Sequence, residues 1–378
     1  MSLYLHIVPH HSSDIHHNIY LQIHIGVRES LLILLDLLPL ITMSRYAAAH
    51  ANPQGAGDAR PTALQIVKDE NLEGKLAGKV IVITGTSAGI GIETARALST
   101  TGATLLLTGR DKSKAYQALT GILDPPRVTF VEMDNASLDS VRTAAATILD
   151  KTGGQVNILI NNAGIMAVPD LQLTKDGHEL QFGTNHLAHF LLFQLLKQAL
   201  IESSTPEFHS RVVNVSSSGH RIHRINESDN YNFEKGEYNP WVAYAQSKVA
   251  NIYMANEIDR RYGSNGLHAT SVHPGGIATT GLAKHMNPAV FEGFFSDPVK
   301  VRGLKSAEQG AATTVIAAIG KEWENKGGRY LVDCAEAIQG DEDGDMERLT
   351  YVSHTYDPKS ETRLWQDSLK IVGLKDDV

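Results

Sequence analysis

A β-branched run that leads through three glycines into a helix is the feature that most constrains the fold of this chain. Residues 79–84 have the composition of a buried parallel strand, and residues 92–100 follow with helical spacing. Between them, Gly85 permits a tight turn, Gly89 lets the backbone approach a pyrophosphate, and Gly91 permits close packing of helix on strand. Because the N-terminus of such a helix binds phosphate, this stretch favours a dinucleotide site over a glycine-rich turn without a ligand.

The same alternation of strand and helix recurs along the chain. Two βαβ units in succession form the first half of a doubly wound sheet. We therefore predict an α/β fold: a Rossmann-type, doubly wound, parallel seven-stranded sheet with helices on both faces, in a single domain. The expected strands are 79–84, 104–108, 128–133, 157–160, 211–215, 267–272 and 328–333, and the expected helices are 63–72, 92–100, 138–150, 177–201, 241–262 and 306–319.

Residues 1–42 differ from the rest of the chain. They hold six of the 17 histidines, and we expect a disordered extension or a stretch outside the natural translated product. Their longest apolar run, 31–41, is shorter than the roughly 20 residues that cross a bilayer, so no stable membrane span is expected and a membrane-surface role is the weaker alternative. Next come an irregular lead-in at 43–78, the Rossmann domain at 79–340, and a C-terminal tail at 341–378 that packs on the domain and begins with an acidic, solvated loop.

Charge and residue counts exclude several classes of protein. A net charge of −8 argues against a nucleic-acid-binding surface. Cys334 is the only cysteine, so no internal disulfide can form, and we expect a small buried apolar residue there. His186 and His189 have no acidic or cysteine companions at ligand spacing, so we interpret them as helix-surface or packing residues and predict no metal site.

Tyr244 and Lys248 lie four residues apart in a segment without Gly or Pro, so they share one face of a helix. A phenol with an ordinary pKa of about 10 is a poor proton donor or acceptor at neutral pH. A fixed ammonium one turn away stabilises the phenolate, so we expect Lys248 to lower the pKa of Tyr244 into a working range. The pair alone is weak evidence, because ordinary helix surfaces also produce this spacing.

The order of motifs resembles the classical short-chain dehydrogenases/reductases. Their glycine motif, Thr-Gly-x-x-x-Gly-x-Gly, stands at residues 84–91, and their Asn-Asn-Ala-Gly motif stands at 161–164. The Tyr-x-x-x-Lys pair follows at 244–248. The segments 181–187 and 217–220, with the 26 residues that separate Ser217 from Tyr244, look most like the retinol-dehydrogenase-like branch and its fungal relatives.

The resemblance implies a role for each matching residue. Tyr244 would be the general acid or base, Lys248 would support it and anchor the ribose, and Asn185 would hold a water for proton relay. Ser217 would hydrogen-bond the substrate carbonyl, with Ser216 and Ser218 as close competitors. The residues expected to hold the cofactor are Gly85, Ser87, Gly89, Ile90, Gly91, Arg110, Asp134 (at the adenine), Asn162, Ala163, Gly164, Tyr244, Lys248, and Ile277 with Thr279 (at the carboxamide).

The tip of the second strand favours NADP(H) over NAD(H). An NAD site usually ends this strand with an acid that binds the ribose 2′-hydroxyl, whereas here Arg110 is placed to meet a 2′-phosphate. Lys112 and Lys114 add positive potential. Asp111 is the counter-evidence, but capping of the following helix explains it better.

We therefore predict an NADP(H)-dependent oxidoreductase that interconverts a carbonyl and a primary or secondary alcohol on a small, largely apolar substrate, with a place in secondary metabolism as a weaker inference. Aromatic residues in 218–243 would line the pocket or an oligomer contact, and the Phe-rich stretch 281–301 would form a lid. The expected location is cytoplasmic, with a homodimer as a further possibility. Two alternatives are a non-catalytic NADP-binding sensor or scaffold, and an epimerase or dehydratase of the extended branch; the latter usually has a different glycine spacing from that of residues 85–91.

Overall fold

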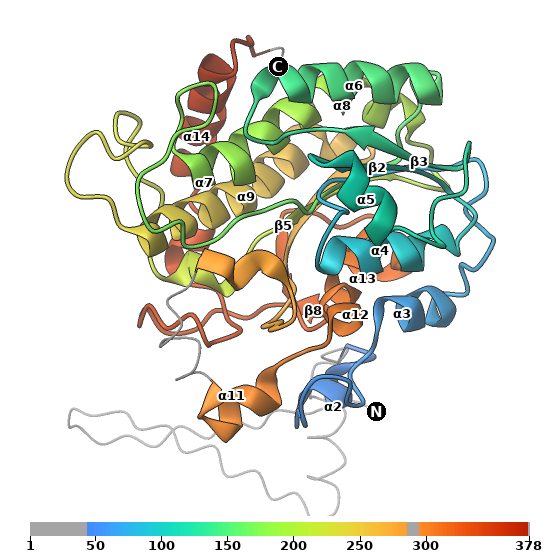
Figure 1. Ribbon diagram of the computed structural model, residues 1–378, viewed down its shortest axis with the longest axis horizontal. Helices are drawn as coiled ribbons and strands as arrows, with labels where there is room; N and C mark the ends of the chain where they lie inside the picture. Colours follow the sequence, from blue (N-terminus) through green and yellow to red (C-terminus); the bar gives the residue numbers. More distant parts are fainter. Residues whose placement is uncertain (1–43, 286–294, 377–378) are drawn as a thin grey trace, which may run out of the picture. The chain divides into compact units, whose positions relative to one another are not determined.

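The computed structural model describes residues 44–285 and 295–376, and these are built around one eight-stranded sheet (Figure 1). The strand order is β3-β2-β1-β4-β5-β6-β7-β8. The strands are β1 Val80–Ile83, β2 Thr104–Gly109, β3 Val128–Glu132, β4 Ile158–Asn161, β5 Ser210–Val215, β6 Leu267–His273, β7 Arg329–Val332 and β8 Ala335–Glu336.

The first seven strands run parallel, as the sequence predicts, and each begins and ends within one residue of its predicted bounds. Strand β1 pairs with β2 on one side and β4 on the other, and all four of its residues are buried. A continuous apolar run is what a strand covered on both faces requires. The sequence did not predict β8, a two-residue strand antiparallel to β7 that follows a turn with positive φ at Asp333 (50°) and Cys334 (60°). Cys334 is buried, as expected.

Helices cover both faces of the sheet, which is the predicted doubly wound arrangement (Figure 1). The helices on one face are α6 Leu138–Thr152, α8 Ala188–Ser203, α9 Pro240–Tyr262 and α14 Pro358–Ile371. Those on the other face are α3 Ala63–Asp69, α4 Ile90–Ser99, α5 Lys112–Ala118 and α13 Ala312–Ile319.

The remaining described elements are short. They are α2 Ala47–His50, α7 Leu180–Phe182, α11 Pro298–Gly303 and α12 Ala307–Gly310, the π-helix η1 Gly183–Leu187, and the 3₁₀ helices η2 Ser218–Arg221, η3 Gly263–Asn265, η4 Gly281–His285, η5 Lys321–Trp323 and η6 Ser353–Thr355. Among the helices of the described ranges, none is long and apolar enough to cross a membrane.

The predicted helix 177–201 is wrong in its first part. Gly177 has a φ of +83° and lies in a turn, and the buried Glu179 accepts hydrogen bonds from the N–H groups of Gln181 and Phe182, so the helix begins only at Leu180. Its second turn is the π-helix η1 rather than an α-helical turn. The sequence shows an unbroken apolar run here and gives no sign of the wider turn, although π turns often occur at functional sites.

Helix α14 packs the C-terminal segment onto α8 and α9. The buried Trp365 meets the rings of Phe190 and Phe193 at centroid distances of 5.0 and 6.0 Å. The acidic loop 341–347 is mostly exposed, as expected, and it is also anchored, because the buried Arg221 donates hydrogen bonds to the Asp341 and Asp345 carbonyl oxygens, both at 2.8 Å. The expected extension at 1–42, and Phe291 and Phe294 of the expected lid, lie outside the described residues.

Candidate active site

The glycine turn after β1 has no room for side chains. A Cβ on Gly91 would lie 2.3 Å from the Gly85 carbonyl oxygen, and one on Gly85 would lie 2.6 Å from the Ala163 Cα. Both Gly85 (φ 71°) and Gly89 (φ 64°) have positive φ, a conformation that glycine adopts without strain. Gly89 directly precedes α4, so the free N–H groups of that helix face the turn, as the predicted pyrophosphate site requires.

The ends of β1 and β4 are tied together by Thr84. Its hydroxyl oxygen accepts hydrogen bonds from the N–H groups of Asn162 and Ala163, both at 2.9 Å. The Asn162 side chain donates through Nδ2 to the carbonyl oxygens of Thr84 (2.8 Å) and Gly85 (3.2 Å). The Asn162 Oδ1 atom is buried and has no hydrogen-bond partner among the described residues, so it is available to a ribose hydroxyl. A cradle closed to side chains and a buried free acceptor both fit a dinucleotide.

The residues predicted to bind the adenosine end lie around the tips of β2 and β3. Arg110 is exposed, whereas Asp111 caps α5 by accepting a hydrogen bond from the Lys114 N–H at 2.9 Å. A Cβ on Gly109 would lie 3.2 Å from the Ser87 hydroxyl oxygen, which places Ser87 beside the end of β2. Asp134 accepts hydrogen bonds from the Ala136 N–H (3.0 Å) and the Lys175 ammonium (3.2 Å) at the end of β3.

The turn after β6 carries the two residues predicted at the carboxamide. Ile277 and Ile90 both pack against Gly310, where a Cβ would lie 2.7 Å from Ile277 Cγ1 and 3.0 Å from Ile90 Cγ2. The neighbouring Thr279 is exposed, and a Cβ on Gly89 would lie 3.3 Å from Thr280. This turn therefore lies next to the N-terminus of α4, so the predicted phosphate and carboxamide residues form one continuous site.

Ser217 and Tyr244 lie together at the carboxyl end of β5. A Cβ on Gly219 would lie 2.9 Å from Tyr244 Cε1 and 3.4 Å from Ser217 Oγ, which leaves the phenol ring and the hydroxyl adjacent to one backbone position. Ser216 uses its hydroxyl elsewhere, donating to the Lys248 carbonyl oxygen at 2.7 Å, whereas the contact of Ser218 with His273 Nδ1 at 3.2 Å is made by its backbone N–H. Ser217 Oγ accepts from the Gly219 N–H at 3.0 Å and is the serine hydroxyl that lies beside the Tyr244 ring.

The expected lowering of the pKa of Tyr244 by Lys248 is wrong for this structure. Burial raises the pKa of Tyr244 to about 12, with a hydrogen bond to Ser217 acting in the opposite direction. Burial also lowers the pKa of Lys248 to about 8. The Lys248 ammonium lies 5.5 Å from the centre of the Tyr244 ring and donates to the Val215 carbonyl oxygen at 3.1 Å. For the pKa of Tyr244, desolvation of the phenol therefore outweighs any lowering by the nearby Lys248 ammonium.

Asn185 lies in the π-helix η1 and meets Lys248 at Gly164. A Cβ on Gly164 would lie 3.3 Å from Asn185 Oδ1 and 3.4 Å from Lys248 Nζ. The Asn185 amide is already in use: Oδ1 accepts from the Ile165 N–H at 2.9 Å, and Nδ2 donates to the Ile165 carbonyl oxygen (3.0 Å) and the Ser247 hydroxyl (2.9 Å). In this arrangement Asn185 fixes the backbone beside Lys248.

Three buried asparagines support the backbone that holds Lys248: Asn161, which belongs to the predicted Asn-Asn-Ala-Gly motif, and Asn214 and Asn251, which sequence reasoning missed. Asn161 Nδ2 donates to Asn214 Oδ1 at 2.8 Å, and Asn214 Nδ2 donates to the Asn251 carbonyl oxygen at 3.1 Å. Asn251 Nδ2 then donates at 3.0 Å to the Val215 carbonyl oxygen that also accepts from Lys248. Amides inside the apolar strands β4 and β5 were a usable signal, because a buried amide needs partners.

His186 and His189 both pack in the interior. Of the two roles expected for them, packing is therefore confirmed, and a position on the helix surface is wrong. Burial lowers the pKa of His186 to about 3 and that of His189 to about 4, so both rings are neutral. His189 bridges the Asn185 carbonyl oxygen (Nδ1, 2.9 Å) and the Thr84 hydroxyl (Nε2, 2.9 Å), which links the π-helix to the glycine turn. Within the described ranges, no three His, Cys, Asp or Glu side chains are grouped so that they could hold a metal ion.

Tyr231 and Tyr238, two of the aromatic residues of 218–243, contact other parts of the chain rather than Tyr244. Tyr231 is buried against Phe182 at a ring distance of 4.9 Å, and the Tyr238 hydroxyl donates to the Val168 carbonyl oxygen at 2.9 Å. Trp241 is the exception, because it is half-buried and lies edge-on to the Tyr244 ring at 6.3 Å. The inserted loop therefore mainly braces the helices around the site.

Comparison with known proteins agrees with this geometry. The sequence profile of the family described as short chain dehydrogenase matches residues 79–290, more than half of the chain. The chain is 51% identical over 332 residues to short-chain dehydrogenase/reductase prx1 of Penicillium roqueforti, covering 88% of this chain and 96% of the relative. It is 42% identical over 345 residues to oxidoreductase calI of Penicillium decumbens, with 89% and 99% covered.

More distant relatives are similar over most of the same region. The chain is 34% identical over 304 residues to retinol dehydrogenase 13 of Mus musculus, with 79% of this chain and 85% of the relative covered. Among solved structures, an uncharacterized protein from Mycobacterium paratuberculosis matches with a TM-score of 0.63 and 32% identity, covering 85% of this chain and 100% of that one. The predicted resemblance is thereby confirmed, and the chain belongs to the short-chain dehydrogenase/reductase family.

Proposed function

We propose that this protein is an NADP(H)-dependent oxidoreductase that interconverts a carbonyl and a primary or secondary alcohol on a small, largely apolar substrate. One observation carries the proposal: Ser217 and Tyr244 lie together beside Lys248, which in turn lies against Gly164. The adjoining residue Ala163 contacts Gly85 of the glycine turn. The proton donor Tyr244 and the glycine turn are therefore connected through Lys248 and the two consecutive residues Ala163 and Gly164.

The side chains divide the reduction between them. Ser217 and Tyr244 hydrogen-bond the substrate oxygen, and the buried phenol gives that oxygen its proton as the general acid. NADPH, when bound, supplies the hydride to the carbonyl carbon, so that hydride and proton together complete the alcohol. The Lys248 ammonium stabilises the phenolate left on Tyr244, and Asn185 keeps the backbone around Lys248 in place. The reverse oxidation uses the same groups.

The preference for NADP(H) rests on the two residues at the tip of β2. Asp111 is occupied in capping α5, so Arg110 is the residue left to meet the ribose end of the cofactor. A guanidinium pairs with a 2′-phosphate through two parallel hydrogen bonds, which NADH cannot offer. Fluorescence titration with NADPH and NADH should give tighter NADPH binding that Arg110→Ala weakens. The matched control is Arg96→Ala, which removes an exposed guanidinium that pairs with Glu93 of its own helix. Equal binding of both cofactors would overturn the Arg110 argument.

Catalysis itself is tested at the phenol. Tyr244→Phe should lower carbonyl reduction by at least about 100-fold and change NADPH binding far less, because the proton donor is lost while the other residues expected to hold the cofactor remain. Tyr253→Phe removes another buried hydroxyl from the same helix, one that donates to the His354 carbonyl oxygen, and should keep its activity. Unchanged function in Tyr244→Phe would favour the sensor or scaffold. A product formed without net redox change would favour an epimerase or dehydratase.

The finer assignments are part of the same proposal. Phe295 lies just before α11 and Val299 lies within it, in the described part of the expected lid. Both are exposed apolar side chains, and they suit an apolar substrate.

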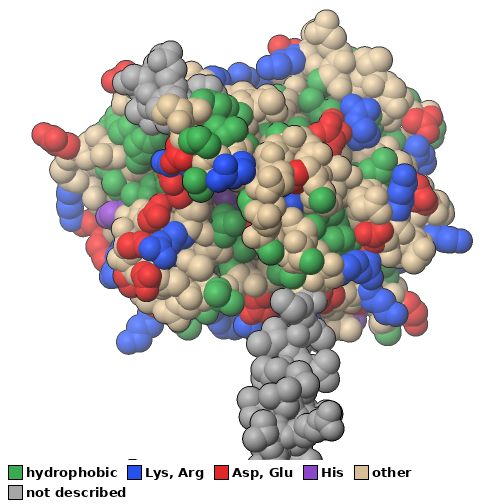
Figure 2. All heavy atoms as spheres, turned by 90° about the horizontal axis from the view of Figure 1, so that it is seen from below, with side chains coloured by type: hydrophobic (Ala, Val, Ile, Leu, Met, Phe, Trp, Pro, Cys, Tyr) green, Lys and Arg blue, Asp and Glu red, His purple; other side chains and the backbone are tan. Residues whose placement is uncertain are grey.

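The similarity to Penicillium relatives supports a fungal context and, as a further proposal, secondary metabolism in the cytoplasm. Basic and acidic side chains are interspersed across the described part of the face in Figure 2, which fits a small-molecule substrate better than a nucleic acid. A panel of apolar ketones and aldehydes, with gel filtration for the homodimer, tests these points.

A further inference from the structure

The lead-in before the Rossmann domain is bound tightly to the segment that follows α11. We infer that Arg60 is a positioning residue for the nicotinamide end of the site, an inference that rests on the proposed function. The lead-in lies outside the stretch that matches the family profile.

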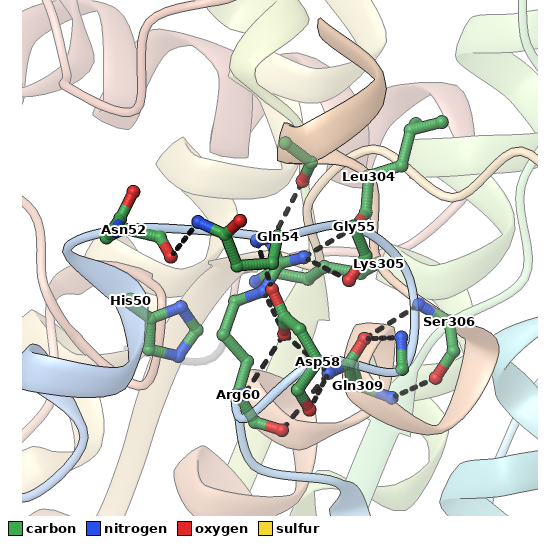
Figure 3. Close-up of polar contacts among 12 residues, drawn as sticks. His50, Asn52, Gln54, Gly55, Asp58, Arg60, Leu304, Lys305, Ser306 and Gln309 are labelled. Atoms are coloured by element: carbon green, nitrogen blue, oxygen red, sulfur yellow. Dashed lines mark hydrogen bonds and ion pairs between the residues drawn. The ribbon is translucent and has the colours of Figure 1, made fainter. Parts of the chain in front are cut away.

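Arg60 is almost fully buried, and its guanidinium donates four hydrogen bonds (Figure 3). Nη1 donates to the Gly303 carbonyl oxygen at 2.9 Å, and Nη2 donates to the Leu304 carbonyl oxygen at 2.6 Å. Nε donates to Asp58 Oδ1 at 2.8 Å, and burial leaves only 3% of the Arg60 side chain and 10% of the Asp58 side chain exposed. Gly303 and Leu304 are the last residue and the C-cap of α11, so Arg60 satisfies carbonyl groups that a helix end leaves without partners.

Gln309 reinforces the same contact one helix later. Its Oε1 accepts from the Gly57 N–H at 2.9 Å, and its Nε2 donates to the Asp58 and Arg60 carbonyl oxygens, both at 3.1 Å (Figure 3). Gln309 also closes the capping box of α12 with Ser306. The two side chains therefore join the lead-in to the segment 303–310 at both of its ends.

The opposite side of the segment 303–310 touches the turn after β6. The Lys305 N–H donates to the Gly276 carbonyl oxygen at 2.8 Å, and a Cβ on Gly275 would lie 2.8 Å from Lys305 Cδ. Gly310 packs on Ile277, one of the two residues predicted at the carboxamide. A shift in the position of Arg60 would therefore move the segment 303–310, and with it the turn that would hold the nicotinamide.

An ion pair with Asp333 holds Lys305, a residue of the segment 303–310 that contacts the turn after β6. The Lys305 ammonium donates to Asp333 Oδ1 at 2.6 Å, and His50 of the lead-in lies 3.3 Å from the same oxygen. Lys305 is buried, so its position is set by this pair rather than by solvent. The lead-in therefore contacts the segment 303–310 directly through Arg60, and reaches it again through His50 and Asp333.

We therefore expect the loss of Arg60 to affect the binding of only one half of the cofactor, the nicotinamide half. Arg60 is linked to residues 275–277, whereas the adenosine end is expected at Arg110 and Asp134, which follow the strands β2 and β3 at the other end of the sheet. Loss of Arg60 should loosen the nicotinamide end and leave binding of the adenosine end as it was. A residue with a merely structural role would weaken both halves together or neither.

The experiment compares NADPH with 2′,5′-ADP, which carries only the adenosine end. In Arg60→Ala, we expect the Kd of NADPH to rise about tenfold, and the emission of bound NADPH to shift toward that of the free cofactor. The Kd of 2′,5′-ADP should stay within about twofold of the wild-type value. The control Arg45→Ala removes an exposed guanidinium from the same lead-in, 3.2 Å from Glu70, and should change neither ligand.

Two further variants keep the inference open to refutation if Arg60→Ala does not fold. Arg60→Lys keeps one charged donor and should restore part of the NADPH affinity, and Gln309→Ala should reproduce the selective loss. Equal weakening of both ligands, or no change in either, would overturn the inference. A wild-type protein that binds neither NADPH nor 2′,5′-ADP would instead overturn the proposed function.

Discussion

The pH profile of carbonyl reduction should have a descending limb near pH 8 that belongs to Lys248. Reduction needs the Tyr244 phenol protonated, and burial raises the pKa of Tyr244 to about 12, so this requirement is met at every ordinary assay pH. It also needs the Lys248 ammonium, whose pKa burial lowers to about 8. A group with that pKa keeps about one-eleventh of its protons at pH 9 and about one-hundredth at pH 10. We therefore expect kcat/KM for reduction to fall about fivefold between pH 8 and 9 and about tenfold between pH 9 and 10.

The assay follows NADPH absorbance between pH 6 and 10 at low substrate concentration. Lys248→Met should have a low rate without this limb, because the titrating group is gone. Lys197→Met is the matched control: it also removes a buried lysine, but one in α8 that donates to Gln194 Oε1 at 3.2 Å, and it should keep the limb. A wild-type rate that stays constant to pH 10, or a limb that survives in Lys248→Met, would refute the reasoning. Oxidation, which needs both the phenolate and the same ammonium, should rise with pH up to about 8 and then level off, because above that value the gain in phenolate and the loss of ammonium cancel.

Three further changes test separate parts of the structure. Gly91→Ala should abolish NADPH binding in a fluorescence titration, because the new Cβ would lie 2.3 Å from the Gly85 carbonyl oxygen, whereas Gly281→Ala, whose new Cβ would meet no atom of the described residues within 4 Å, should bind normally. Asn251→Ala should lower kcat about tenfold with little change in the Kd of NADPH, because Asn251 and Lys248 share one carbonyl oxygen. Trp365→Ala should lower the free energy of unfolding by about 3–5 kcal/mol in chemical denaturation, because a fully buried ring is lost, with cofactor affinity retained in the folded protein.

The sequence was sufficient for the sheet and for much of the site because both are encoded locally. A parallel strand covered on both faces must be a short apolar run, and the glycine turn needs residues without side chains at fixed spacing. Gly85 and Gly91 confirm this, since each lies where a Cβ would collide with backbone atoms. Tyr244 and Lys248 were found for the same reason, because helical spacing alone brings them to one face.

Features that depend on distant parts of the chain were predicted less well. The pKa of Tyr244 was expected to follow its neighbour Lys248, but burial by the whole domain decides its direction. The start of the helix near Asn185 is set by Glu179, a buried carboxylate that a local pattern does not distinguish from an exposed one. Tyr231 was expected near the substrate because it lies in a loop, whereas its ring packs against Phe182 in the interior.

These distant contacts share one feature: residues outside the range 79–290 hold in place residues that lie within that range. Arg60 fixes the segment that touches the turn after β6, and the Ser368 hydroxyl lies 2.9 Å from His186 Nε2, beside Asn185 in the π-helix. Arg221, four residues after Ser217, is buried in hydrogen bonds to the acidic loop of the C-terminal segment. The family profile therefore covers the residues proposed to carry out the chemistry, while the lead-in and the C-terminal segment hold them in place. Because these two outer regions contact different parts of the site, sequence changes within them can alter nicotinamide placement and helix position without changing any residue in the proposed catalytic set.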